Sequence, residues 1–177
     1  NLTISTRKNS SIKKLGDFEF ENLEFKENAY DKKILDKLNE YDYILISVPP
    51  INSNDLFLKN LANHVSESSK IKSILYLSST SVYGDHNGAW VNEESETKPK
   101  TKMGIDRLHI ENKWIEFSKK KKLPIQIFRL AGIYSEKNNA VSRLQNKKSF
   151  LVVKENHFFS RIHINDISEI LYLSLIN

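Results

Sequence analysis

The chain has 177 residues, no cysteine, 39% hydrophobic residues and a formal net charge of +5. This length allows one domain with a substantial core, and the missing cysteines exclude disulfides and thiolate metal sites. The longest apolar run, residues 170–176, is too short to span a bilayer, and no secretory signal is visible. We therefore expect no membrane partner and a cytoplasmic location.

The first half of the chain alternates between strand-like and helix-like patterns. The apolar run at 43–48 is continuous and stops at Pro49-Pro50, which is typical of a strand buried on both faces. In chain order, the patterns predict extended segments at 2–6, 18–20 and 23–25, a helix at 31–39, a strand at 43–48, a helix at 56–65 and a strand at 73–77.

The second half continues this alternation after a polar loop at 85–100. Asp166 and Glu169 are spaced as in a capping box, which predicts the start of a last helix. The predicted elements are a helix at 102–119, a strand at 123–130, shorter strands at 150–153 and 158–164, and a helix from about 165. We expect one side of the 102–119 helix to be lined by Ile105, Leu108, His109, Trp114 and Ile115. Alternating strands and helices predict an α/β fold with a mostly parallel sheet covered by helices.

The most informative motif is Ser78-Ser79-Thr80-Ser81-Val82-Tyr83-Gly84, directly after the apolar run 74–77. It places a cluster of hydroxyls at the carboxyl end of a strand, the edge where ligands bind in open α/β sheets. Together with the helical segment that opens at Met103, this motif resembles the extended short-chain dehydrogenase/reductase superfamily, of the NAD-dependent epimerase/dehydratase type. The resemblance implies a Rossmann-like, doubly wound sheet with helices on both faces, and a nicotinamide dinucleotide cofactor.

The second motif of that family, Tyr-x-x-x-Lys, is altered in this chain. Met103 stands at the Tyr position and Arg107 at the Lys position. Residues four apart share a helix face. The resemblance implies that the Lys of the pair holds the cofactor ribose, and Arg107 keeps the positive charge and can donate to the ribose hydroxyls. A methionine has no exchangeable proton and an arginine stays protonated, so the usual proton relay is lost. The pattern resembles the atypical subgroup without the Tyr. The alternative reading of Arg107 is an exposed residue that pairs with Glu111.

The resemblance assigns catalytic and substrate-binding roles near the first motif. Ser79, with Thr80 beside it, would hydrogen-bond and polarise a substrate oxygen, and Tyr83 would contact the substrate. The alternative is a hydroxyl cluster that only caps the next turn. Arg161 could meet an anionic group of the substrate. The replacement acid or base, if there is one, would be Tyr83 or His86, although neither has the expected spacing.

Further positions are implied to hold the cofactor. Arg7 follows the strand that would end at the adenosine ribose, and an arginine there accommodates a 2′-phosphate. We therefore expect NADP, with NAD possible; a plain basic loop residue is the alternative. The resemblance adds two segments that would line the cofactor, Ser47-Val48-Pro49 and Leu130-Ala131-Gly132-Ile133, the second departing from the family pattern after Tyr134. No histidine spacing indicates a metal site.

The glycine-rich phosphate loop of a Rossmann domain has no counterpart in the sequence. The resemblance places residues 2–7 at the second strand of such a domain. We therefore expect residues 1–177 to be a single NAD(P)-binding domain truncated at both ends, without the first strand and phosphate loop and with an incomplete substrate lobe. The alternative is a protein that never had the loop.

Three classes of function are compatible with these patterns. The first is an NAD(P)-dependent oxidoreductase or epimerase/dehydratase-like protein that acts on a nucleotide sugar or a related carbonyl or alcohol. The second is a catalytically silent NADP(H)-binding sensor or partner-binding module. The third, a nucleic-acid-binding fragment, is opposed by the scattered lysines, and the one dense cluster at 119–122 has no interleaved aromatics and complements a helix end. We therefore expect no nucleic-acid partner. The oligomeric state is not predicted.

Overall fold

The computed structural model describes residues 2–7, 14–66, 69–146 and 158–176. Its central element is a parallel three-stranded sheet in the order β5 (Tyr43–Ile46), β6 (Ser73–Ser79) and β7 (Ile125–Leu130). The register pairs Tyr43 with Ser73 and Ile74 with Ile125. All three carboxyl ends therefore meet at one edge, as the strand pattern predicts.

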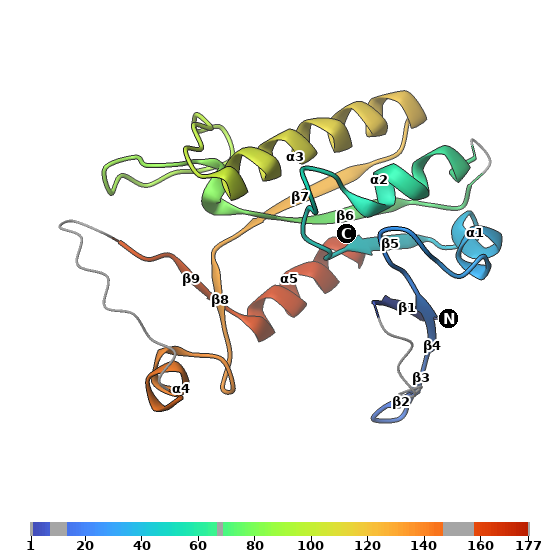
Figure 1. The fold of residues 1–177 in the computed structure, drawn as a ribbon, viewed down its shortest axis with the longest axis horizontal. Coiled ribbons are helices and arrows are strands. Elements are labelled where there is room, and N and C mark those ends of the chain that lie inside the picture. Colours follow the sequence, from blue (N-terminus) through green and yellow to red (C-terminus); the bar gives the residue numbers. More distant parts are fainter. Residues whose placement is uncertain (1, 8–13, 67–68, 147–157, 177) are drawn as a thin grey trace.

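Helices cover both faces of this sheet (Figure 1). The helices α2 (Leu56–Asn60) and α3 (Lys102–Lys121) lie on one face, and α5 (Ile164–Ile176) lies on the other. The side-chain amide of Gln126 on β7 donates to the Ser174 carbonyl, which ties α5 to the sheet. The doubly wound α/β class is therefore confirmed.

Smaller parallel pairs flank the central sheet. β1 (Thr3–Thr6) pairs with β4 (Glu21–Glu24), and β8 (Gly132–Tyr134) pairs with β9 (Arg161–His163). The one antiparallel strand pair among the described strands joins β2 (Lys14–Leu15) and β3 (Phe18–Glu19). The remaining elements are α1 (Lys33–Leu38), a 3-10 turn at Ala62–His64, a 3-10 turn at Thr80–Val82 and α4 (Ala140–Gln145).

The core lies between the sheet and α2 and α3. Its centre is the Trp114 ring, which is fully buried and has the rings of Phe57, Tyr76 and Phe117 at 5.4–5.9 Å. These contacts fix α3 on the sheet, because large aromatic side chains contribute much of the buried apolar area. In the described part of the chain, no helix has the length and apolar character needed to cross a membrane.

The structure differs from the predicted elements at two of the predicted helices, and it contains β8 and α4, which were not predicted. The predicted 56–65 helix is split, because α2 ends at Asn60 and a 3-10 turn follows. The predicted capping box at Asp166 is wrong: β9 runs directly into α5, which begins at Ile164, and the Asn165 amide donates to the His163 ring instead. The predicted strand at 150–153 lies outside the described residues.

Candidate functional site

The hydroxyl cluster lies where β6 ends. Ser79 is the last residue of the strand, and its hydroxyl oxygen accepts the Ser81 amide at 3.2 Å, which caps the 3-10 turn. The capping role is thus real, but within the described residues it uses one acceptor site of the Ser79 hydroxyl, whose hydrogen remains available to donate. Ser79 and Thr80 are both partly exposed, so both can meet a ligand at this edge.

Arg107 lies in the second turn of α3 and reaches the same strand. Its guanidinium donates to the Leu77 carbonyl at 2.7 Å and to the Tyr76 hydroxyl at 3.5 Å. The predicted alternative, a surface pair with Glu111, is wrong because Glu111 is buried and pairs with Arg129. Burial raises the pKa of Tyr76 to about 12, so this phenol stays neutral at physiological pH and serves as a fixed partner.

A cleft of about 360 Å³ opens beside Arg107. It brings together the segment that follows β5 and the first two turns of α3, and its lining residues are Pro49, Pro50, Lys102, Met103, Asp106 and Arg107. The Met103 side chain is 65% exposed. The cleft therefore combines apolar walls with two cations and the Asp106 carboxylate, and it has no proton-exchanging group at position 103.

Polar contacts of Asp106 hold one wall of the cleft in place. The Ser53 hydroxyl donates to Asp106 at 2.7 Å, and Lys102 donates to the other carboxylate oxygen at 2.8 Å. These contacts lower the pKa of Asp106. Asn52 and Ser53 both have positive φ, at 48° and 59°, so the turn after Pro50 is a tight one that Asp106 fixes against α3.

A buried charge network lies directly behind the hydroxyl cluster. The Glu111 carboxylate, 1% exposed, accepts the Ser78 hydroxyl at 2.5 Å and two nitrogens of Arg129 at 2.8–3.3 Å. The Arg129 guanidinium lies 4.9 Å from the centre of the Tyr83 ring, and the bonds to Glu111 raise its pKa above the ordinary value. The network joins α3, β6, β7 and the turn after β6.

Tyr83 and His86 are both engaged in the structure of that turn. Tyr83 is 6% exposed and faces Arg129. The Nε2 atom of His86 lies 3.1 Å from the backbone oxygens of Tyr83 and Glu96. The His86 bonds anchor the loop that follows. Among the described residues, neither the Tyr83 ring nor the His86 ring has a contact with Met103.

The other predicted positions lie on neighbouring strand ends. Arg7 follows β1 and is exposed, while Ser47 and Val48 follow β5. The segment from Leu130 to Ile133 joins β7 to β8, and the β8–β9 register places Gly132 beside Arg161. A Cβ on Gly132 would lie 2.4 Å from the Arg161 guanidinium, so the Arg161 side chain packs directly over this glycine. The Arg161 guanidinium is also 5.3 Å from the Phe159 ring centre.

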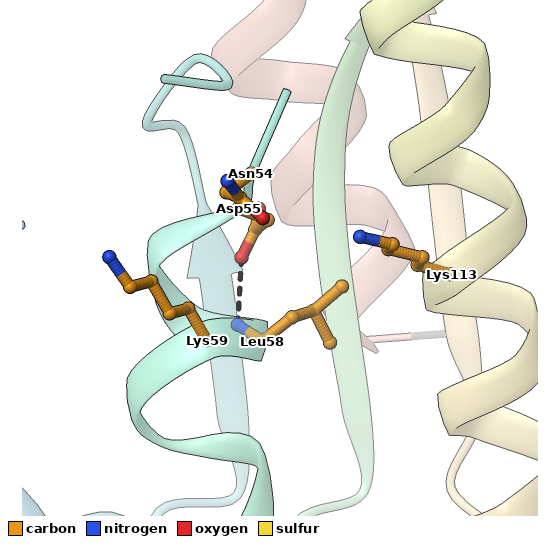
Figure 2. Close-up of a pocket in the computed structure, with 5 residues that line it drawn as sticks. All are labelled: Asn54, Asp55, Leu58, Lys59 and Lys113. Atoms are coloured by element: carbon orange, nitrogen blue, oxygen red, sulfur yellow. Dashed lines mark hydrogen bonds between the residues drawn. The ribbon is translucent and has the colours of Figure 1, made fainter. Parts of the chain in front are cut away.

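A smaller pocket of about 190 Å³ lies outside this region, between α2 and α3 (Figure 2). Asp55 caps α2 there by accepting the Leu58 amide at 2.9 Å, and its other oxygen accepts the Trp114 indole at 3.4 Å. Lys59 and Lys113 flank it on either side (Figure 2). Because Asp55 is buried and both of its oxygens are used, this pocket is part of the scaffold.

Sequence reasoning missed the partners that organise this edge. Glu111 was considered only as a surface partner of Arg107, Arg129 received no role, and the cleft-lining residues Pro50, Lys102 and Asp106 were not assigned to the site. The available signal was spacing: Glu111 lies four residues after Arg107 and three before Trp114, on one helix face. Among the described residues, no cluster of three or more His, Asp or Glu side chains could hold a metal ion.

Comparison with known proteins gives a family match and related folds. The sequence model of the NAD dependent epimerase/dehydratase family matches residues 50–173. A solved protein from Silicibacter pomeroyi, described as functionally unknown and conserved, is 31% identical, with a TM-score of 0.75 over 89% of this chain and 53% of that chain. The comparison with curated proteins finds no match.

Two epimerase structures share the fold at lower identity. The UDP-N-acetylglucosamine 4-epimerase from Methanobrevibacter ruminantium M1, in complex with UDP-N-acetylmuramic acid, is 17% identical with a TM-score of 0.74, over 99% of this chain and 65% of that chain. The UDP-glucuronic acid 4-epimerase from Bacillus cereus, in complex with UDP-glucuronic acid and NAD, is 18% identical with a TM-score of 0.68, over 89% and 56%. The chain thus spans about half to two thirds of the length of these structures.

Proposed function

The chain belongs to the NAD-dependent epimerase/dehydratase family, and from this premise we propose that it is an NADP(H)-binding domain that acts on a nucleotide sugar or a related carbonyl or alcohol. The observation that carries the proposal is the cleft beside Arg107, at the edge where β5, β6 and β7 end. Ligands of open α/β sheets bind at this edge. NAD and nucleotide sugars are bound by the epimerase structures that share the fold.

The residues of the cleft fit a dinucleotide. Pro49 and Pro50 supply apolar surface, and Arg107 and Lys102 supply positive charge toward ribose hydroxyls and phosphates. Ser47, Val48 and the segment from Leu130 to Ile133 would complete the cofactor surface. A bound nicotinamide would supply the hydride acceptor or donor. We propose that residues 1–177 act as one such NAD(P)-binding domain.

The chain's own groups would orient the substrate and hold charge. Ser79 would donate its free hydroxyl hydrogen to the substrate oxygen, with Thr80 beside it. Arg107 stays protonated, and Met103 offers no proton, so any proton that accompanies hydride transfer must reach the substrate by another route. Arg161 would meet an anionic group of the substrate, and Tyr83 would contribute by packing under Arg129 at this edge.

The preference for NADP over NAD rests on Arg7. Titration calorimetry with NADPH and NADH, on the product of the complete open reading frame, tests the cofactor and its class together. We expect NADPH to bind about 10–100-fold more tightly, the value of a charge-assisted contact of about 1.5–3 kcal/mol. Arg7→Ala should remove most of this difference, whereas Arg143→Ala, a matched change on α4, should not. Equal affinities of the unaltered protein for both cofactors would contradict the NADP assignment, and no binding of either would contradict the function.

The second candidate function is a silent NADP(H)-binding sensor or partner-binding module. It is favoured by the exposed Met103 in the cleft wall, where a proton-exchanging residue would be needed for the usual chemistry. Tight NADPH binding without turnover of any carbonyl, alcohol or nucleotide-sugar substrate would support this candidate over an enzyme.

A further inference from the structure

Glu111 is a buried carboxylate that no step of the proposed chemistry uses. It is 1% exposed, and among the described residues its carboxylate accepts hydrogen bonds from Ser78 and Arg129. Taking a charged pair out of water is costly, and an apolar pair of similar volume would often serve stability equally well. The full burial of Glu111, beside an Arg129 side chain that is 21% exposed, therefore calls for a reason other than core packing.

The three members of the network, on β6, β7 and α3, each lie close in the chain to a residue of the candidate site. Ser78 directly precedes Ser79 on β6, Arg129 directly precedes Leu130 on β7, and Glu111 lies one helical turn after Arg107 on α3. Each member is thus next to a residue with a predicted ligand-binding role. Hydrogen bonds are directional, and a carboxylate that accepts from both strands fixes their relative position more narrowly than apolar contacts do.

A second link makes the arrangement on α3 rigid over two turns. Arg107 donates to the Leu77 carbonyl at 2.7 Å, and Glu111 accepts from Ser78 at 2.5 Å. Consecutive residues of β6 are therefore held by consecutive turns of α3. Tyr83 extends the network into the turn after β6, because its ring faces the Arg129 guanidinium at 4.9 Å.

We propose that Glu111 is a positioning residue, which acts through Ser78 and Arg129 to hold Ser79 and Arg107 in place at the cofactor cleft. The role for ligand binding rests on the proposed function. The positional role itself concerns the strand ends and can be tested without a ligand.

The test compares two replacements of the network in the product of the complete open reading frame. Glu111→Gln removes the charge and leaves Arg129 without its anion. The double change Glu111→Leu with Arg129→Met removes both charges, so thermal stability should return close to that of the unaltered protein. Amide hydrogen exchange, followed by mass spectrometry, should nevertheless rise at least severalfold in residues 77–84 and 105–108 of both variants. NADPH affinity should fall about tenfold, the scale of one charge-assisted hydrogen bond.

Asp55→Asn is the matched control, because Asp55 is a buried, hydrogen-bonded carboxylate in the same core but outside the cleft. It should leave exchange in 77–84 and NADPH affinity unchanged, whatever its effect on stability. A purely structural role predicts that the double variant regains exchange protection and affinity together with stability, and that result would overturn the proposal. If the unaltered protein binds neither dinucleotide, the proposed function fails, while the exchange data still decide whether Glu111 positions the strand ends.

Discussion

At the scale of single residues, the buried polar groups show how the fold tolerates charge in its core. Glu111 has a directly bonded cationic partner in Arg129, whereas Asp55 is held by backbone amides and the Trp114 indole N–H and has no ion pair among the described residues. Accordingly, the pKa of Asp55 is raised, chiefly because burial disfavours its charged form and its hydrogen bonds offset this only in part. The two carboxylates lie in one core but should affect stability differently.

Asp55 should make the protein less stable as pH rises. In the pH range between the ordinary value of 3.8 and its raised folded pKa, the native state binds more protons than the unfolded state, so the free energy of unfolding falls with increasing pH. Asp55→Asn removes this dependence. We expect the stability advantage of the unaltered protein over Asp55→Asn to shrink from pH 3.5 upward and to level off above the folded pKa, as measured by urea unfolding. An advantage that grows with pH would contradict the assignment.

At the scale of elements, α3 carries most of the architecture of the site. Its N-terminus is capped by Thr101, whose hydroxyl accepts the Gly104 amide at 3.1 Å. A Cβ on Gly104 would lie 2.6 Å from the Ser81 carbonyl oxygen, so this glycine lets the helix approach the turn after β6. The lysine cluster in its last turn agrees with the predicted helix end.

The extent of α3 could be predicted from the sequence, but its buried face could not. Ile105, His109 and Ile115 were expected on the covered side and are exposed, whereas Ile110, Glu111, Trp114 and Phe117 are buried. Apolar residues occur on both sides of this helix, so periodicity alone does not select one. The choice is made by Arg129 and Ser78, which supply partners for Glu111 from strands distant in the sequence.

The end of α3 offers a direct stability test. Lys122 follows the helix with a left-handed backbone, φ 54° and ψ 36°, which is unfavourable for a residue with a Cβ. Lys122→Gly should therefore raise the free energy of unfolding by about 0.5–1 kcal/mol, since part of the gain is lost to the larger entropy of unfolded glycine. Lys120→Gly, one residue before the end of the helix, should lower it by about 1 kcal/mol. Chemical denaturation measures the free energy of unfolding of both variants. Destabilisation by Lys122→Gly would contradict the left-handed backbone conformation of Lys122.

At the scale of the whole molecule, the alternation of strands and helices was enough to predict a mostly parallel sheet covered by helices, and the family resemblance added that the helices lie on both faces. The sequence did not predict which parallel strands pair with one another. They form the pairs β1–β4 and β8–β9 and the central sheet of β5, β6 and β7, and this pairing depends on neighbours far apart in sequence. The hydroxyl motif could be placed at the sheet edge, since it follows an apolar strand. The cleft could not, because its walls come from two segments about 50 residues apart.

The fold and the altered pair together lead to a prediction about catalysis. Met103 lines the cleft, and its thioether cannot exchange a proton. Met103→Tyr with Arg107→Lys should therefore raise carbonyl-reduction activity of the complete protein by about 10²–10⁴-fold, the usual value of general acid–base help. Ser79→Ala should lower it, because the substrate oxygen loses its donor. NADPH oxidation with a panel of carbonyl and nucleotide-sugar substrates is the measurement.

Met103→Phe with Arg107→Lys isolates the contribution of the phenol. The ring fills the same part of the cleft but carries no hydroxyl, and the lysine is the same in both variants. A gain with tyrosine and none with phenylalanine would show that the proton of the phenol limits the reaction. An equal gain with both would mean that the shape of the cleft or the lysine is responsible. Strong turnover of the unaltered protein that Ser79→Ala leaves unchanged would show that the reaction does not depend on the Ser79 hydroxyl.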